Sequence, residues 1–181
     1  TDKVLATRPH KVIYQDGDKV WKVFDANYPK TDVLNEALNQ ARVEETGLPI
    51  PRVHGVTVNE EGKWAIISDY IEGETLAEKM AKDPESLEKY MKQFVEIQLE
   101  IHDKTAPLLN KMKDKMSVRI NSLKAVNATT RYELSTRLEG MPKHKKVLHG
   151  DYNPTNVVID KDGKYYILDW SHATQGNASA D

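Results

Sequence analysis

Apolar and polar positions divide the chain into a strand-rich first third, a helical middle and a mixed tail. Residues 10–15 and 19–25 alternate in polarity, which predicts two strands. The Asp-Gly pair within residues 16–18 favours a tight turn, so the two runs are expected to form a β-hairpin. In its second strand, Val20, Lys22 and Phe24 share one face. A lysine on a buried face requires a partner for its charge.

A helix is predicted to begin at Thr31 or Asp32, either of which can cap it, and to end near Thr46. Gly47 is suited to the position after the helix, and the prolines beyond it prevent the helix from resuming. Helical spacing predicts an apolar stripe that faces the core, made of Leu34, Ala37, Leu38 and Ala41.

The next runs, residues 52–58 and 63–71, predict two further strands joined by a polar turn. After Gly73 the period becomes helical, and residues 84–103 form a long amphipathic segment. Residues 107–140 are polar and helix-prone, without a more detailed assignment.

The tail consists of a short apolar entry, a polar loop, and two strand-like runs at residues 157–160 and 164–170. This order predicts an α+β fold of two lobes that meet near residues 69–73.

Composition is that of a globular protein, with 39% hydrophobic and 30% charged residues among 181. The formal net charge of −2 gives no general attraction to nucleic acid or to an anionic membrane, so neither is an expected partner. The chain has no cysteine, which excludes disulfides, thiolate metal sites and cysteine nucleophiles. Its apolar runs are too short to span a bilayer, and a cytoplasmic location is expected.

Three polar residues stand beside strand-like runs of the tail. Asn156 follows Asp151 by five residues, and Asp169 follows Asn156 by thirteen. Nucleotide-dependent phosphoryl transfer needs a carboxylate to orient or deprotonate a hydroxyl, together with oxygen ligands that hold Mg²⁺ against the phosphates. Asparagine and aspartate supply such hard oxygen ligands.

The segment HGDYNPTN, residues 149–156, resembles the H-G-D-x-x-x-x-N catalytic loop of the aminoglycoside phosphotransferase and choline kinase families, which have a protein-kinase-like fold. The continuation from Asp169 to Asp181 resembles their pattern D-W-x-x-A-x-x-G-x-x-x-x-D. The resemblance implies that Asp151 is the catalytic base and that His149 supports the loop. It also implies that Asn156 and Asp169 bind Mg²⁺, and that Asp181 braces the loop through backbone hydrogen bonds.

The first third of the chain agrees with this resemblance. Lys22 stands where these families contact the nucleotide phosphates, and Glu36 stands where a helix glutamate pairs with that lysine. Glu36 lies on the flank of the predicted stripe, beside Val33 and Gln40, so helical spacing alone does not establish the pair. The segment SDYIEG resembles the connector between lobes. There the resemblance implies that the backbones of Asp69 and Ile71 bind the adenine edge. It also implies that Val20 and Val158 pack on the two faces of the adenine.

Two features depart from the families. The turn that covers the phosphates would fall within residues 1–10, which contain no glycine. The families also continue into helices beyond the position of Asp181, so the second lobe is expected to be truncated relative to them. The expected lobes are a nucleotide-binding lobe at residues 1–70 and a catalytic lobe at residues 71–181.

The expected function is transfer of the γ-phosphoryl group of ATP or GTP to a hydroxyl of a small molecule, such as an aminoglycoside, a choline-like or a sugar-like acceptor. Protein kinases usually carry a lysine two residues after the catalytic aspartate, where this chain has Asn153. The alternative is a catalytically weak, pseudokinase-like regulatory module that binds nucleotide. A metallophosphoesterase is disfavoured because the clustered histidine and aspartate ligands are missing. The sequence does not indicate an oligomeric state.

Overall fold

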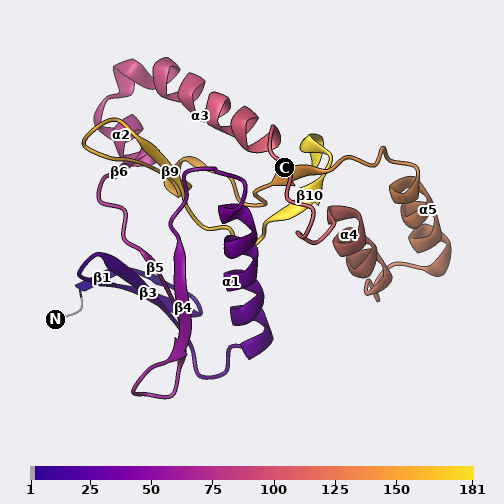
Figure 1. Cartoon of the computed structure of the whole chain (residues 1–181). Helices are drawn as coiled ribbons and strands as arrows, with labels where there is room; N and C mark the ends of the chain where they lie inside the picture. The colour runs from indigo at the N-terminus through magenta and orange to yellow at the C-terminus, as the bar shows by residue number, and fades with distance from the viewer. Residues whose placement is uncertain (1–2) are drawn as a thin grey trace.

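The computed structural model describes residues 3–181 and contains a five-stranded sheet, a helix beside it, and a second, mainly helical part (Figure 1). All neighbouring strands of the sheet are antiparallel, in the order β1-β2-β3-β5-β4. Their bounds are β1 Lys3–Arg8, β2 Lys11–Asp16, β3 Lys19–Phe24, β4 Val53–Val58 and β5 Trp64–Asp69. Residues 1 and 2, with which the expected first lobe begins, lie outside the described residues.

The predicted hairpin is confirmed as β2 and β3, with Ile13 opposite Lys22 in the register. Gly17 has a φ of 60° in the connecting turn, a backbone conformation that glycine adopts without steric cost. The sequence pattern missed β1, because an edge strand that is mostly exposed has little polar alternation to reveal it. The β1–β2 turn consists of residues 9 and 10 and thus lies within the segment expected to cover the phosphates.

Helix α1, Lys30–Glu44, is confirmed, but its predicted cap is wrong, and of its predicted stripe only Ala37 is buried. Pro29 precedes its first turn, and no side chain caps it. Leu34 and Leu38 are 44% and 46% exposed. The buried face instead holds Val33, Glu36, Ala37, Asn39 and Val43. Spacing of apolar residues misplaced this face because two of its five buried members are polar.

The second part follows β5 and contains short strands between its helices (Figure 1). Thr75 caps the helix that follows it, since its Oγ1 accepts a hydrogen bond from the amide of Glu78 at 3.0 Å. Strands β6, β8 and β9 form one small sheet, and β7 pairs with β10. The bounds are β6 Glu74–Thr75, α2 Leu76–Lys82, α3 Leu87–His102, α4 Met112–Asn121, α5 Ala128–Glu139, β7 Lys146–Leu148, β8 Val157–Ile159, β9 Tyr165–Ile167 and β10 Thr174–Gly176.

Two hydrophobic clusters form the core of the described residues. The smaller lies between the large sheet and α1 and contains Phe24, Val33, Ala37 and Ile66. The larger joins α2, α3 and the short strands, and it also includes Val43, Leu48 and Ile50 from the end of α1 and the loop after it. Through these three residues the helix beside the first sheet is fixed to the second part. Among residues 3–181, no helix has the length and apolar character to cross a membrane.

The connector between β5 and β6 passes very close to β8. A Cβ atom added at Gly73 would stand 2.3 Å from the carbonyl oxygen of Ile159 and 2.9 Å from Cγ1 of Val158. Only a residue without a side chain allows this approach.

We expect Gly73→Ala to lower the free energy of unfolding by about 1–3 kcal/mol, because the added methyl group must displace backbone atoms of β8. Gly55→Ala is the matched control, since a Cβ at Gly55 meets nothing within 4 Å. Denaturant unfolding of both variants measures the difference. Equal losses in the two would contradict the close approach.

Candidate active site

The loop between β7 and β8 carries the first candidate residues. Asp151 is exposed, and its backbone N–H donates to Nδ1 of His149 at 3.1 Å. The side-chain amide of Asn153 donates to Oδ1 of Asp151 at 3.3 Å. The carboxylate is therefore held toward solvent, where an acceptor hydroxyl can reach it.

His149 is fully buried beneath this loop. Its Nε2 lies 2.8 Å from the carbonyl oxygen of Leu168, so Nε2 carries the proton while Nδ1 accepts from Asp151. Its ring packs 4.6 Å from that of Trp170, and burial lowers the pKa of His149 below its ordinary value. A neutral imidazole of fixed tautomer thus connects the loop to the segment after β9.

Asp181 fixes the loop from the other side. Its carboxylate accepts hydrogen bonds from the backbone N–H groups of His149, at 3.0 Å, and Gly150, at 2.8 Å. The same carboxylate lies 2.7 Å from Nε2 of His102 at the end of α3, and only 1% of the Asp181 side chain is exposed. The backbone contacts expected of Asp181 are present, and the contact with His102 is one that sequence reasoning missed.

Gly150 has a conformation that a residue with a side chain cannot adopt here. Its φ is 89°, and an added Cβ would lie 2.5 Å from the carbonyl oxygen of His172. The glycine that distinguishes HGD from HRD is therefore required by the packing of the segment after Asp169.

Asn156 and Asp169 are brought together by the backbone. The N–H of Leu168 donates to the carbonyl oxygen of Asn156 at 2.7 Å, and Asp169 is the next residue. The Asn156 side-chain nitrogen donates to the carbonyl oxygen of Asp151 at 2.9 Å, which leaves its Oδ1 as the atom available to a cation. These are hard oxygen donors of the type that Mg²⁺ takes.

Asp169 is held in an unusual conformation. Its φ of 61° is in the left-handed region, which aspartate tolerates better than most residues. The Ser171 hydroxyl donates to its Oδ1 at 3.0 Å. Burial acts to raise the pKa of Asp169, but Lys22, Lys11 and the Ser171 hydroxyl outweigh it and hold the pKa below its ordinary value. The carboxylate is therefore charged at neutral pH. No cluster of three histidine, aspartate or glutamate ligands occurs in residues 3–181, so a cation here would need further oxygens, such as those of phosphates.

Lys22 and Glu36 form the expected ion pair, with Nζ and Oε2 3.2 Å apart. Lys11 lies 3.6 Å from the other oxygen, Oε1, and was missed. The register could have identified it, because Lys11 stands opposite Phe24 and so shares a face with Lys22.

The connector residues are less closely joined to this cluster. The Asp69 N–H donates to the carbonyl oxygen of Arg52, so it is not free for a ligand. The Asp69 carboxylate accepts from His54 and from the Arg52 amide. The Ile71 N–H makes no backbone hydrogen bond within the part of the chain that the structure describes. Val158 is buried on β8, and Val20 lies on the face of Lys22.

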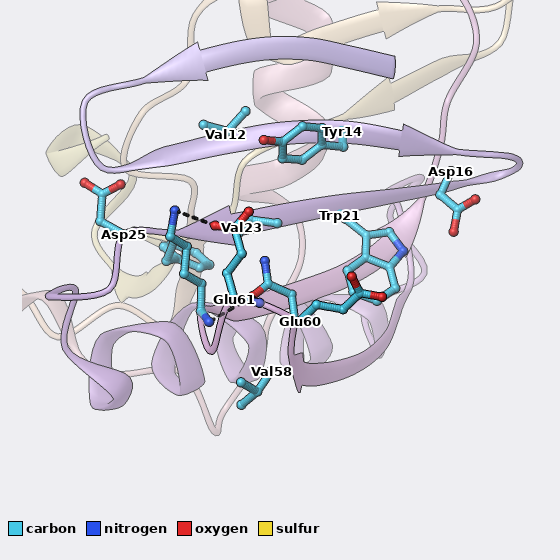
Figure 2. A pocket seen from close by; sticks show the side chains of 12 residues that line it. Val12, Tyr14, Asp16, Trp21, Val23, Asp25, Val58, Glu60 and Glu61 are labelled. Carbon is cyan, nitrogen blue, oxygen red and sulfur yellow. Dashed lines mark hydrogen bonds and ion pairs between the residues drawn. The ribbon is translucent and has the colours of Figure 1, made fainter. Parts of the chain in front are cut away.

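A hollow of about 520 Å³ lies on the face of the large sheet opposite the Lys22–Glu36 ion pair (Figure 2). Figure 2 shows Tyr14 and Trp21 on neighbouring strands, with Glu60 and Glu61 from the β4–β5 turn beside them. Trp21 precedes Lys22 in β3 and therefore points away from the ion pair. This hollow is separate from the candidate catalytic residues.

The stability of the protein is expected to fall as the pH is lowered through 6.5. The pKa of folded His149 lies below its ordinary value of 6.5, so the unfolded chain binds the extra proton first. This one group contributes a slope of at most about 1.4 kcal/mol per pH unit. Denaturant unfolding between roughly pH 7.5 and pH 5 measures it. His149→Gln should reduce the slope, whereas His144→Gln, at an exposed position, should keep it. A slope unchanged in His149→Gln would contradict the neutral buried state.

Comparison with solved structures shows a protein-kinase-like fold. A ternary complex of a thermostable mutant of aminoglycoside phosphotransferase APH(4)-Ia with ADP and hygromycin B matches 99% of this chain and 69% of its own, at 18% identity and a TM-score of 0.68. Aminoglycoside-3'-phosphotransferase of type VIII matches 100% and 74%, at 16% identity and a TM-score of 0.64. A choline/ethanolamine kinase family protein from Mesorhizobium loti matches 98% and 60%, at 17% identity and a TM-score of 0.60.

No curated protein sequence matches the chain. The model of the phosphotransferase enzyme family (APH) matches residues 10–181, which include every candidate site residue named above. The resemblance of the HGDYNPTN loop and the α+β, two-lobed fold expected from it are thereby confirmed. The chain belongs to the phosphotransferase enzyme family.

Proposed function

We propose that this protein transfers the γ-phosphoryl group of ATP or GTP to a hydroxyl of a small molecule. The observation that carries the proposal is the joining of three groups by hydrogen bonds to backbone carbonyl groups. Asp151 and Asn156 share one loop, and the Leu168 amide ties Asp169 to Asn156. Phosphoryl transfer depends mainly on such positioning and on electrostatic stabilisation.

In the proposed complex the nucleotide lies between a lobe of residues 1–70 and a lobe of residues 71–181. Lys22, oriented by Glu36, contacts the phosphates. The Ile71 amide and the Asp69 carbonyl meet the adenine edge. Val20 and Val158 pack on the two faces of the base.

Asn156 and Asp169 would hold Mg²⁺, which neutralises charge on the phosphates when bound. The contact from Ser171 leaves Oδ2 of Asp169 available, and the charged state of this carboxylate suits a hard cation. Asp151 then orients the acceptor hydroxyl and takes its proton. His149 and Asp181 keep the loop backbone in place but do not touch the reacting atoms.

The acceptor is proposed to be a small hydroxylated molecule. Asn153 occupies the position where protein kinases usually carry a lysine, which favours a small acceptor over a protein. Similar structures include a complex with hygromycin B and a choline/ethanolamine kinase family protein, and their acceptors define the classes to screen first. A soluble cytoplasmic setting, without nucleic acid or membrane partners, is part of the proposal.

A catalytically weak nucleotide-binding module is the second candidate. The β1–β2 turn, Pro9 and His10, lacks glycine and offers only one backbone N–H, so it encloses phosphates poorly. The retained Asp151, Asn156 and Asp169 favour the enzyme.

MgATP or MgGTP is expected to raise the melting temperature. At a nucleotide concentration about 100 times the Kd, the added stability is about 2.7 kcal/mol, or roughly 5–10 °C for a domain of this size. Thermal unfolding with magnesium alone is the control. The absence of a shift with either nucleotide at millimolar concentration would contradict nucleotide binding.

Substitution of Asp151 and of Asp169 tests their two proposed roles separately. Asp151→Asn is expected to bind MgATP as the wild type does but to lose ~10²–10⁴ in turnover, because a general base is removed. Asp169→Asn is expected to weaken MgATP binding, because a charged ligand of the cation is lost. Calorimetric titration measures binding. Turnover is measured with an acceptor identified by ADP release among aminoglycosides, choline, homoserine and sugars.

Asp162→Asn is the matched control, at an exposed turn between β8 and β9. It should change neither quantity. If Asp151→Asn lost nucleotide binding in a folded protein, or kept near wild-type turnover, the role proposed for Asp151 would be wrong.

A further inference from the structure

Glu36 is a buried carboxylate with a lysine at each oxygen. Lys22 reaches Oε2 from β3 at 3.2 Å, and Lys11 reaches Oε1 from the start of β2 at 3.6 Å. The Glu36 side chain is 7% exposed, whereas those of Lys22 and Lys11 are 18% and 22% exposed. Each lysine therefore keeps part of its surface open to a ligand.

The charges of this cluster do not balance. Within this cluster one carboxylate and two ammonium groups leave one positive charge, which attracts an anion: the Asp169 carboxylate is one, and the phosphates of a ligand would be another. Both lysines lie on one face of the hairpin, because Lys11 stands opposite Phe24 and Phe24 is two residues from Lys22, so both are on the side of the proposed phosphate site. Lys22 is the closer partner of Glu36, at 3.2 Å against 3.6 Å for Lys11, and Lys11 is the more exposed of the two cations.

Lys11 also has a suitable place in the chain. It directly follows the β1–β2 turn, the segment whose backbone would have to cover the phosphates. Pro9 has no N–H, and the turn has no glycine to allow a close backbone approach. A lysine side chain at this point reaches the same space with three N–H donors.

We propose that Lys11 is a second phosphate-binding residue, which contacts the nucleotide's phosphates and compensates for a turn without glycine. This inference rests on the proposed function, since it assumes a phosphate-bearing ligand beside Lys22. The competing interpretation is that Lys11 serves only to neutralise Glu36. The two interpretations predict different effects of substituting Lys11. Only if Lys11 contacts the phosphates should the loss of affinity depend on the number of phosphates in the ligand.

The test is a titration of ATP, ADP, adenosine and inorganic tripolyphosphate, each with Mg²⁺, into wild type and Lys11→Gln. We expect Lys11→Gln to weaken ATP and tripolyphosphate binding roughly 10- to 100-fold, the range for a lost charged hydrogen bond. Adenosine binding should stay unchanged. Lys11→Arg should recover most of the affinity, because it keeps the charge.

Lys63→Gln is the matched control: Lys63 also pairs with a glutamate, Glu61, but beside the hollow of Figure 2. It should bind all four ligands as the wild type does. Unchanged ATP and tripolyphosphate binding in Lys11→Gln would overturn the inference, as would an equal loss for adenosine.

The same titration separates this inference from the proposed function. Tripolyphosphate binding that depends on Lys11, without nucleotide binding, would overturn the proposed function and keep the phosphate role of Lys11. Nucleotide binding that is insensitive to Lys11→Gln would support the proposed function and overturn this role. Wild type that binds none of the ligands would overturn both.

Discussion

The carboxylate of Asp181 is the constraint on which the candidate catalytic loop depends. It accepts the N–H groups of two consecutive residues, His149 and Gly150, and it contacts His102 on α3. The His149 donor is partly removed from water, and without an acceptor it would cost about 1–3 kcal/mol. The Asp181 side chain thus accepts the hydrogen bonds at the start of the loop and connects the loop to α3, the longest helix. The direction of Asp151 follows from this attachment.

A second constraint acts between the large sheet and α1. A helix against a sheet would ordinarily bury only apolar residues, but α1 also buries Glu36 and Asn39. Each has a specific partner: Glu36 has the two lysines, and the Asn39 side-chain nitrogen donates to the carbonyl oxygen of Ser171 at 3.1 Å. Through these contacts α1 connects the Lys22 face of the sheet with the segment that carries Asp169. Its position and the geometry of the candidate metal ligands are therefore linked.

Much of the fold was predictable because local signals were strong. The Asp-Gly turn and alternating polarity identified β2 and β3, and the spacing of Asp151, Asn156 and Asp169 predicted the candidate site, whose loops the structure joins through backbone contacts. The failures involve long-range partners. Sequence spacing could not show that α1 buries polar residues, and nothing local marks His102 as a partner of the distant Asp181 carboxylate. The hairpin register places Lys11 on the face of Lys22, but it does not show that Glu36 reaches Lys11. Edge strand β1, mostly exposed, lacks the alternation that burial imposes.

Gly150 has a consequence for regulation. In H-R-D loops an arginine occupies this position, and in many kinases phosphorylation orders an activation loop through pairs between arginine and phosphate. Here the carbonyl of His172 fills the space that any side chain at this position would need. The loop therefore has no cationic arm with which to capture a phosphorylated residue, and an internal carboxylate orders it instead. A loop built in this way is assembled when the chain folds, and it needs no added phosphate at this point to become ordered.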